Sequence, residues 1–171
     1  FTAYMNAAAP SVWTAAPAQK WGGPVGEGKK GNEGVQGGVV AANGGIGYVE
    51  YSFAENGGLN SAKIDNGSGP IELSAETASK TLETAKIVGT GGDLSMTIDY
   101  ATQEEGAYPI VLVTYEIVCT KGLAAEQAAL VKSFLTFTSS DAGQNILIDL
   151  DYAPLPAEVL TKVQAAVAAL A

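Results

Sequence analysis

The sequence feature that most constrains the fold is a glycine-rich stretch, GEGKKGNEGVQGGVVAANGGIGYVEYSFA, at residues 26–54. Its opening glycines permit a tight backbone turn, and Asn32 follows as a good N-cap for a helix over residues 32–42. An asparagine and two glycines end that helix, and the β-branched and aromatic residues at 46–54 predict a strand. This order places backbone N–H groups and two lysines at a helix N-terminus, which suits an anion.

The rest of the chain alternates between predicted helices and predicted strands. The spacing of apolar residues predicts helices over residues 1–9, 74–88, 124–138, 141–150 and 157–170, with Ser74 as the cap of the second. Alternating or continuous apolar residues predict strands over 93–100 and 108–119. This alternation is typical of an α/β fold, and 171 residues are enough for one domain with a sizeable core.

The start of the chain and its single cysteine each carry a further expectation. The first residues already resemble the interior of a helix, with no cap and no initiator methionine before Phe1, so we expect the natural chain to extend upstream. The single cysteine, Cys119, lies in the apolar run YEIVC and is predicted to be a buried small side chain.

The charge balance excludes several classes of function. The formal net charge is −9, and the nine cations are all lysines, because the sequence has no histidine and no arginine. Nucleic acid is a poor partner for such a chain, because binding it requires a clustered basic face. The usual proton shuttle and the bidentate phosphate-binding side chain are both missing. Enzymatic acid–base chemistry would have to use carboxylates, lysine or tyrosine alone. We expect no enzymatic activity, no metal site and no cofactor.

Two nucleotide-binding motifs are nearly matched in the glycine-rich loop. Gly26, Gly28 and Gly31 have the spacing of the dinucleotide fingerprint, and Glu50 follows at the distance of a ribose-binding acid. However, the preceding residues 19–25 contain a proline and paired glycines and do not predict the required strand. The loop also approaches a P-loop, but a lysine stands where a hydroxyl must hold magnesium. A nucleotide-binding α/β domain that uses residues 26–31 therefore remains only an alternative.

Several long segments resemble the phosphate-binding proteins of high-affinity phosphate ABC importers. In that family a GKGN(D/E)G loop, a helix and a strand of the form GxIGYVEYAYA follow one another, as they do at residues 28–54. The likeness continues, in the family's order, at residues 56–62, 108–119, 134–144 and 149–163. Several long motifs in register are more specific than a three-glycine pattern.

The resemblance implies a type II periplasmic-binding-protein fold, an α/β fold of two lobes, represented here incompletely. Residues 1–112 are then part of the second lobe. Residues 113–171 are the crossover strand and the C-terminal return to the first lobe. The β-branched run at 108–119 is the candidate strand that crosses the hinge.

The resemblance also implies a function and its location. The protein is expected to be an extracytoplasmic solute-binding lipoprotein that captures inorganic phosphate and presents it to the membrane subunits of an ABC permease. Its lipidated cysteine is expected upstream of this chain. The family's main phosphate ligands precede the helix at Phe1, so no direct ligand is expected here, and Gly28, Gly31 and Asn32 are the candidates for lining the cleft. A module that binds no small molecule is a second alternative.

Overall fold

The computed structural model describes residues 1–170, over which it has seven helices and four short strands. The helices are α1 (Thr2–Ala8), α2 (Gly31–Ala41), α3 (Tyr51–Asn56), α4 (Ala75–Glu83), α5 (Ala125–Thr138), α6 (Asp141–Asp149) and α7 (Ala157–Ala168). The strands form two antiparallel pairs, β1 (Ile64–Asp65) with β2 (Pro70–Ile71) and β3 (Lys86–Ile87) with β4 (Met96–Thr97). Among the described helices none has the length and apolar character of a membrane span.

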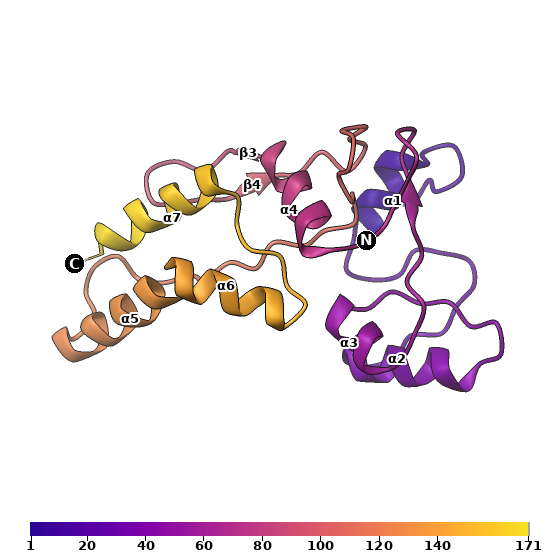
Figure 1. Cartoon of the computed structure of the whole chain (residues 1–171), viewed down its shortest axis with the longest axis horizontal. Helices are drawn as coiled ribbons and strands as arrows, with labels where there is room; N and C mark the ends of the chain where they lie inside the picture. The colour runs from indigo at the N-terminus through magenta and orange to yellow at the C-terminus, as the bar shows by residue number, and fades with distance from the viewer. Residues whose placement is uncertain (171) are drawn as a thin grey trace.

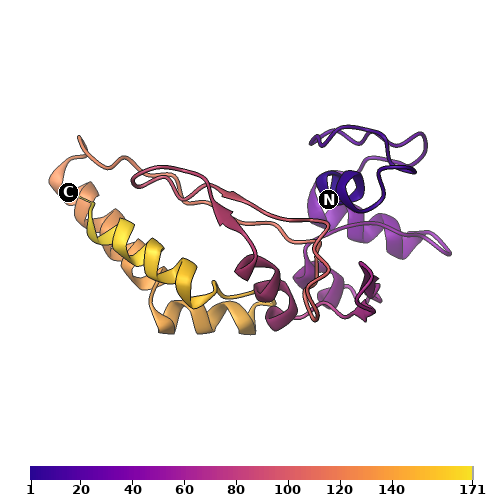
Figure 2. The same cartoon turned by 90° about the horizontal axis from the view of Figure 1, so that it is seen from above.

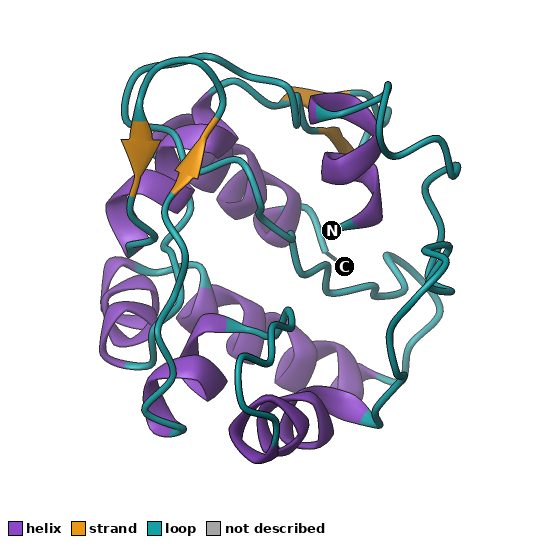
Figure 3. Ribbon diagram, turned by 90° about the vertical axis from the view of Figure 1, so that its right-hand side faces the viewer, coloured by secondary structure: helices purple, strands orange, loops and turns teal. Residues whose placement is uncertain are grey.

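The molecule is elongated (Figure 1). Helices α1 to α3 lie at one end, and α5, α6 and α7 pack together at the other. Helix α4 and the β3–β4 pair lie between the two ends, and long extended segments run along the molecule beside them (Figure 2). Most of the regular secondary structure is helical, and the strands are short and lie between long loops (Figure 3).

The core is small and lies mostly where α4 meets the segment that follows the β3–β4 pair and where α5 meets α7. Thr81 and Pro109 are the largest side chains that are fully buried. The Thr81 hydroxyl donates to the Tyr108 carbonyl over 2.6 Å, and the Tyr108 N–H donates to the Thr77 carbonyl over 2.9 Å. These contacts fix the start of the 108–119 segment against α4.

The predicted helices are confirmed, with small differences at their ends. Ser74 caps α4 as predicted: its hydroxyl accepts from the Thr77 N–H, and the Thr77 hydroxyl accepts from the Ser74 N–H. The helix ends at Glu83 and not near Val88, because the chain turns there into β3. The cap of α2 was predicted wrongly, since Lys30 is its N-cap and Asn32 lies in its first turn.

The predicted strands are largely wrong. Of the residues 46–54, the last four belong to α3, which begins at Tyr51, and those before it belong to no helix or strand. Within 93–100 only β4 is paired, and residues 108–119 are extended without joining a sheet. The cause is physical: β-branched residues favour extended backbone, but a strand also needs a neighbour to accept its hydrogen bonds. Cys119, predicted to be buried, is exposed on the last of these segments.

Candidate functional site

The glycine-rich loop before α2 is the first candidate for an anion site. Gly26 and Gly31 have positive φ values of 118° and 67°, so the turn into α2 uses backbone conformations that favour glycine. Lys29 forms an ion pair with Glu27, with 2.7 Å between Nζ and Oε1, and its stem lies across the glycines of α2. A lysine that already pairs with a carboxylate offers little net positive charge to a phosphate.

The three predicted cleft-lining residues lie at this loop. Gly28 and Gly31 are exposed, and Asn32 is half-buried. The Asn32 Oδ1 accepts from the Glu50 N–H over 3.2 Å, which fixes the start of α3 against α2. None of the three lines either of the two cavities described below. Their role at a cleft therefore remains a prediction.

Glu50 has a partner far along the chain. The Tyr152 hydroxyl donates to its Oε2 over 2.8 Å, a bond between residues 102 positions apart in the sequence. The hydrogen bond to Glu50 raises the pKa of Tyr152 above its usual value, and partial burial adds to the effect. The backbone before Gly26 is irregular, with no strand. A ribose-binding role for Glu50 is thus poorly supported. Its carboxylate already accepts from the Tyr152 hydroxyl, and no strand precedes the glycine-rich loop as the dinucleotide motif requires.

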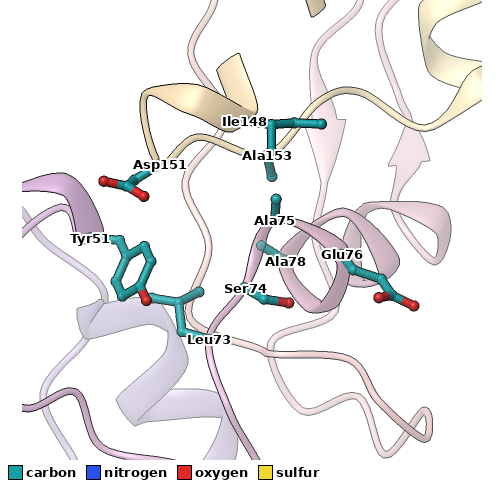
Figure 4. A pocket seen from close by; sticks show the side chains of 9 residues that line it. All are labelled: Tyr51, Leu73, Ser74, Ala75, Glu76, Ala78, Ile148, Asp151 and Ala153. Atoms are coloured by element: carbon teal, nitrogen blue, oxygen red, sulfur yellow. The ribbon is translucent and has the colours of Figure 1, made fainter. Parts of the chain in front are cut away.

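A cavity of about 370 Å³ lies between α3, the start of α4 and the chain after α6 (Figure 4). Its lining comes from distant parts of the sequence: Tyr51, Leu73, Ser74, Ala75, Glu76, Ala78, Ile148, Asp151 and Ala153. The carboxylates of Glu76 and Asp151 lie at opposite ends of the labelled group, and no lysine lines the cavity. Burial raises the pKa of Tyr51, and the neighbouring Glu55 adds to the rise. The two acids make this cavity unsuitable for a phosphate dianion.

A second cavity, of about 460 Å³, lies beside α1 and the β1–β2 turn. Asn66 on its wall donates to the carbonyls of Tyr100 and Thr102 and accepts from the Tyr4 hydroxyl. These bonds occupy the polar groups of Asn66 in holding the turn in place, so its role here is structural. Among the described residues there is no cluster of three or more acidic or cysteine side chains that could hold a metal.

Comparison with known proteins identifies the class of protein. Residues 1–142 match the family described as the PBP superfamily domain, and the chain therefore belongs to this superfamily. The predicted fold class, an incomplete type II periplasmic-binding-protein-like α/β fold, is confirmed. The mixture of helices and short antiparallel strands agrees with it.

The similarity to phosphate-binding proteins is confirmed as well. The chain is 39% identical to the phosphate-binding protein PstS 3 of Mycobacterium leprae (strain TN), over all of the chain and 47% of that relative's length. It is 36% identical to PstS 2 of Mycobacterium tuberculosis (strain ATCC 25618 / H37Rv), over 99% of the chain and 47% of the relative. PstS of Pasteurella multocida (strain Pm70) is 34% identical over 85% of the chain and 41% of its own length. The chain spans about half the length of these relatives.

Sequence reasoning missed the contact between Glu50 and Tyr152 and the cavity beside it. Both join segments that are about one hundred residues apart, and no local pattern marks such a pairing. The nearest signal is the proline-rich corner after α6, which predicts a rigid turn at Tyr152 but gives no partner for its hydroxyl.

Proposed function

We propose that this chain is part of an extracytoplasmic protein that captures inorganic phosphate for an ABC importer. The observation that carries the proposal is the 39% identity, over the whole chain, to a protein named for phosphate binding. The proposed role is binding and transport, without catalysis. We place the protein outside the cytoplasm, anchored by a lipidated cysteine upstream, with the permease membrane subunits as its partner.

The phosphate contacts are proposed to lie mainly outside this chain. Within it, arginine and histidine are absent, Lys29 pairs with Glu27, and the cavity beside Glu76 and Asp151 is acidic. An acidic protein can still hold phosphate through neutral hydroxyls and backbone N–H groups at helix N-termini. An acceptor such as an aspartate would let that site demand a protonated oxyanion and reject sulfate. Gly28, Gly31 and Asn32 would line the edge of the cleft.

We further propose that residues 1–112 and 113–171 belong to two lobes that close around the ligand. The two parts also meet each other within this chain. The Glu50–Tyr152 hydrogen bond joins the two parts, and the acidic cavity is lined from both of them. Closure of two lobes about a hinge is an established way to enclose a small ligand. The segment at 108–119 would be the crossing between the lobes.

The proposal is tested by calorimetric titration of phosphate and of sulfate. One sample is the 171-residue chain, and the other joins it to the part of the M. leprae relative that the chain does not match. We expect the joined protein to bind phosphate saturably and to release no binding heat with sulfate, while the chain alone binds neither. Circular dichroism of both samples establishes that they are folded before the titration.

Three results would contradict the proposal or a part of it. Absence of phosphate binding by a folded joined protein would favour the alternative of a module that binds no small molecule. Saturable micromolar binding of labelled NAD or ATP by either sample, measured by equilibrium dialysis, would instead favour the nucleotide-binding alternative. Tight, sulfate-rejecting phosphate binding by the 171 residues alone would overturn the assignment of the ligands to the other half.

A further inference from the structure

The sequence contains three asparagines that are each followed directly by a glycine, at Asn43, Asn56 and Asn66. Asparagine before glycine is the pair most prone to spontaneous deamidation, because glycine has no side chain to hinder the reaction and its backbone reaches the required conformations easily. The three pairs have the same residues but different surroundings. They differ in the hydrogen bonds that must break before the asparagine can react.

The pair at Asn66 and Gly67 is restrained by four hydrogen bonds. The Asn66 Nδ2 donates to two backbone carbonyls over 3.4 Å and 3.0 Å, and its Oδ1 accepts from the Tyr4 hydroxyl over 3.3 Å. The Gly67 N–H, which would supply the attacking nitrogen, donates to the Asp65 Oδ1 over 2.7 Å. The side chain and the nitrogen are therefore both held, and neither can approach the other until these bonds break.

The pair at Asn56 and Gly57 is restrained by the end of α3. The Gly57 N–H donates to the Phe53 carbonyl over 3.1 Å, and the Gln36 Nε2 donates to the same carbonyl over 2.8 Å. The Gln36 side chain also lies against Gly57, where it would clash with an added Cβ. The attacking nitrogen of this pair is thus held in the last turn of a helix that is itself fixed to α2.

The pair at Asn43 and Gly44 lacks these restraints. Within the described residues 1–170, neither the Asn43 side chain nor the Gly44 N–H forms a hydrogen bond. The two residues lie at the centre of a turn that one bond closes, from the Gly45 N–H to the Ala42 carbonyl over 2.9 Å. Gly44 has a φ of 73° and open space around it. The turn can therefore open, and bring the Gly44 nitrogen to the Asn43 side chain, at the cost of a single hydrogen bond.

We propose that Asn43 is a site of spontaneous deamidation. The Gly44 nitrogen, after losing its proton to hydroxide, attacks the Asn43 Cγ and forms a new N–Cγ bond. The Cγ–Nδ2 bond breaks, ammonia leaves with a proton taken from water, and a cyclic imide remains. Water then opens the imide at either of its two carbonyls, which gives aspartate or, with the main chain running through Cβ, isoaspartate. The net reaction consumes one water, releases one ammonia and involves no oxidation or reduction.

The reaction places a new negative charge where α2 ends. The helix stops at Ala41, so a carboxylate at residue 43 lies at the negative end of the helix dipole and destabilises the last turn. Isoaspartate also lengthens the backbone inside the turn that Gly45 closes. We expect the amides of residues 39–42 to exchange about twofold to fivefold faster after the reaction. Deamidation thus loosens the end of α2 as the protein ages, and phosphate binding is not needed for it.

Peptide mapping by mass spectrometry of the 171-residue chain tests the proposal, because replacing NH₂ by OH changes the mass of the peptide. In the folded chain Asn43 should react at least about tenfold faster than Asn56 or Asn66, since each of these must first break further hydrogen bonds. The rate at Asn43 should rise with the hydroxide concentration. In urea the surroundings are lost, and the three asparagines should react at similar rates.

Asn43→Gln and Asn56→Gln are a matched pair of variants. Glutamine keeps the amide but would have to close a larger ring, so Asn43→Gln should abolish the fast release of ammonia and Asn56→Gln should leave it unchanged. Asn43→Asp supplies the charge without the altered backbone. Hydrogen exchange at residues 39–42 of this variant therefore separates the effect of the charge from the effect of isoaspartate.

Three outcomes would overturn the inference. Reaction at Asn66 as fast as at Asn43 in the folded chain would show that hydrogen bonds do not control the reactivity. The same order of rates in urea and in buffer would assign the difference to neighbouring residues in the sequence and not to the structure. An unmodified Asn43 in a folded chain whose three asparagines all react in urea would mean that the turn stays closed.

Discussion

The buried Thr81 hydroxyl provides a direct test of what holds the middle of the molecule together. Thr81 is fully buried, and its Oγ1 donates to the Tyr108 carbonyl over 2.6 Å. Thr81→Val keeps the shape of the side chain but leaves that carbonyl without its partner in a site closed to water. An unsatisfied buried polar group costs about 1–3 kcal/mol, so we expect the free energy of unfolding to fall by this amount.

The assay is urea unfolding of the 171-residue chain, followed by circular dichroism, with a thermal scan as the second measure. A loss of this size lowers the Tm by roughly 2–12 °C for a chain of this length. Thr81→Ser is the matched control, because it keeps the hydroxyl and removes one methyl group, at a cost of about 1 kcal/mol. The reasoning is refuted if Thr81→Val has the same free energy of unfolding as the natural chain while Thr81→Ser has a clearly lower one. Packing of the methyl group, and not the hydrogen bond, would then determine the stability.

Three further predictions concern the ends of helices and the contact of Tyr152. Ser74→Ala removes the cap of α4 and should lower the free energy of unfolding by about 0.5–2 kcal/mol in the same assay; an unchanged value would mean that α4 does not need its cap. Gly31→Ala forces a side chain into φ 67° and should cost about 1–2 kcal/mol, whereas Gly28→Ala, with open space around it, should be neutral; equal effects would refute the backbone argument. The raised pKa of Tyr152 means that its contribution to stability is complete below the pKa of the unfolded chain and is lost as the pH rises through the folded value. Tyr152→Phe should therefore weaken the loss of stability above about pH 10 seen in pH-dependent unfolding, and an unchanged alkaline profile would contradict the Glu50 contact.

Local sequence signals predicted the helices well because the forces that define a helix are local. The Ser74 cap, the apolar spacing of α5 and α7 and the glycine-rich entry to α2 each act within a few residues. The cap of α2 was misplaced by two residues, since the left-handed Gly31 allows the helix to begin immediately after Lys30. Residues that meet over a long sequence distance, such as Glu50 and Tyr152, carry no comparable signal.

The strand predictions were largely wrong because a strand, unlike a helix, depends on a partner that is distant in the sequence. The two most exposed large apolar side chains in the described structure are Ile117, at 94%, and Ile46, at 92%. Each lies on a segment for which the sequence predicts a strand but which forms no backbone ladder in the structure. The sequence predicts strands at residues 46–54 and 108–119 from residue type alone, whereas a ladder requires a second strand beside each. Local pattern therefore predicts a preference for extended backbone at these residues, and it carries no information about the partner that would accept their hydrogen bonds.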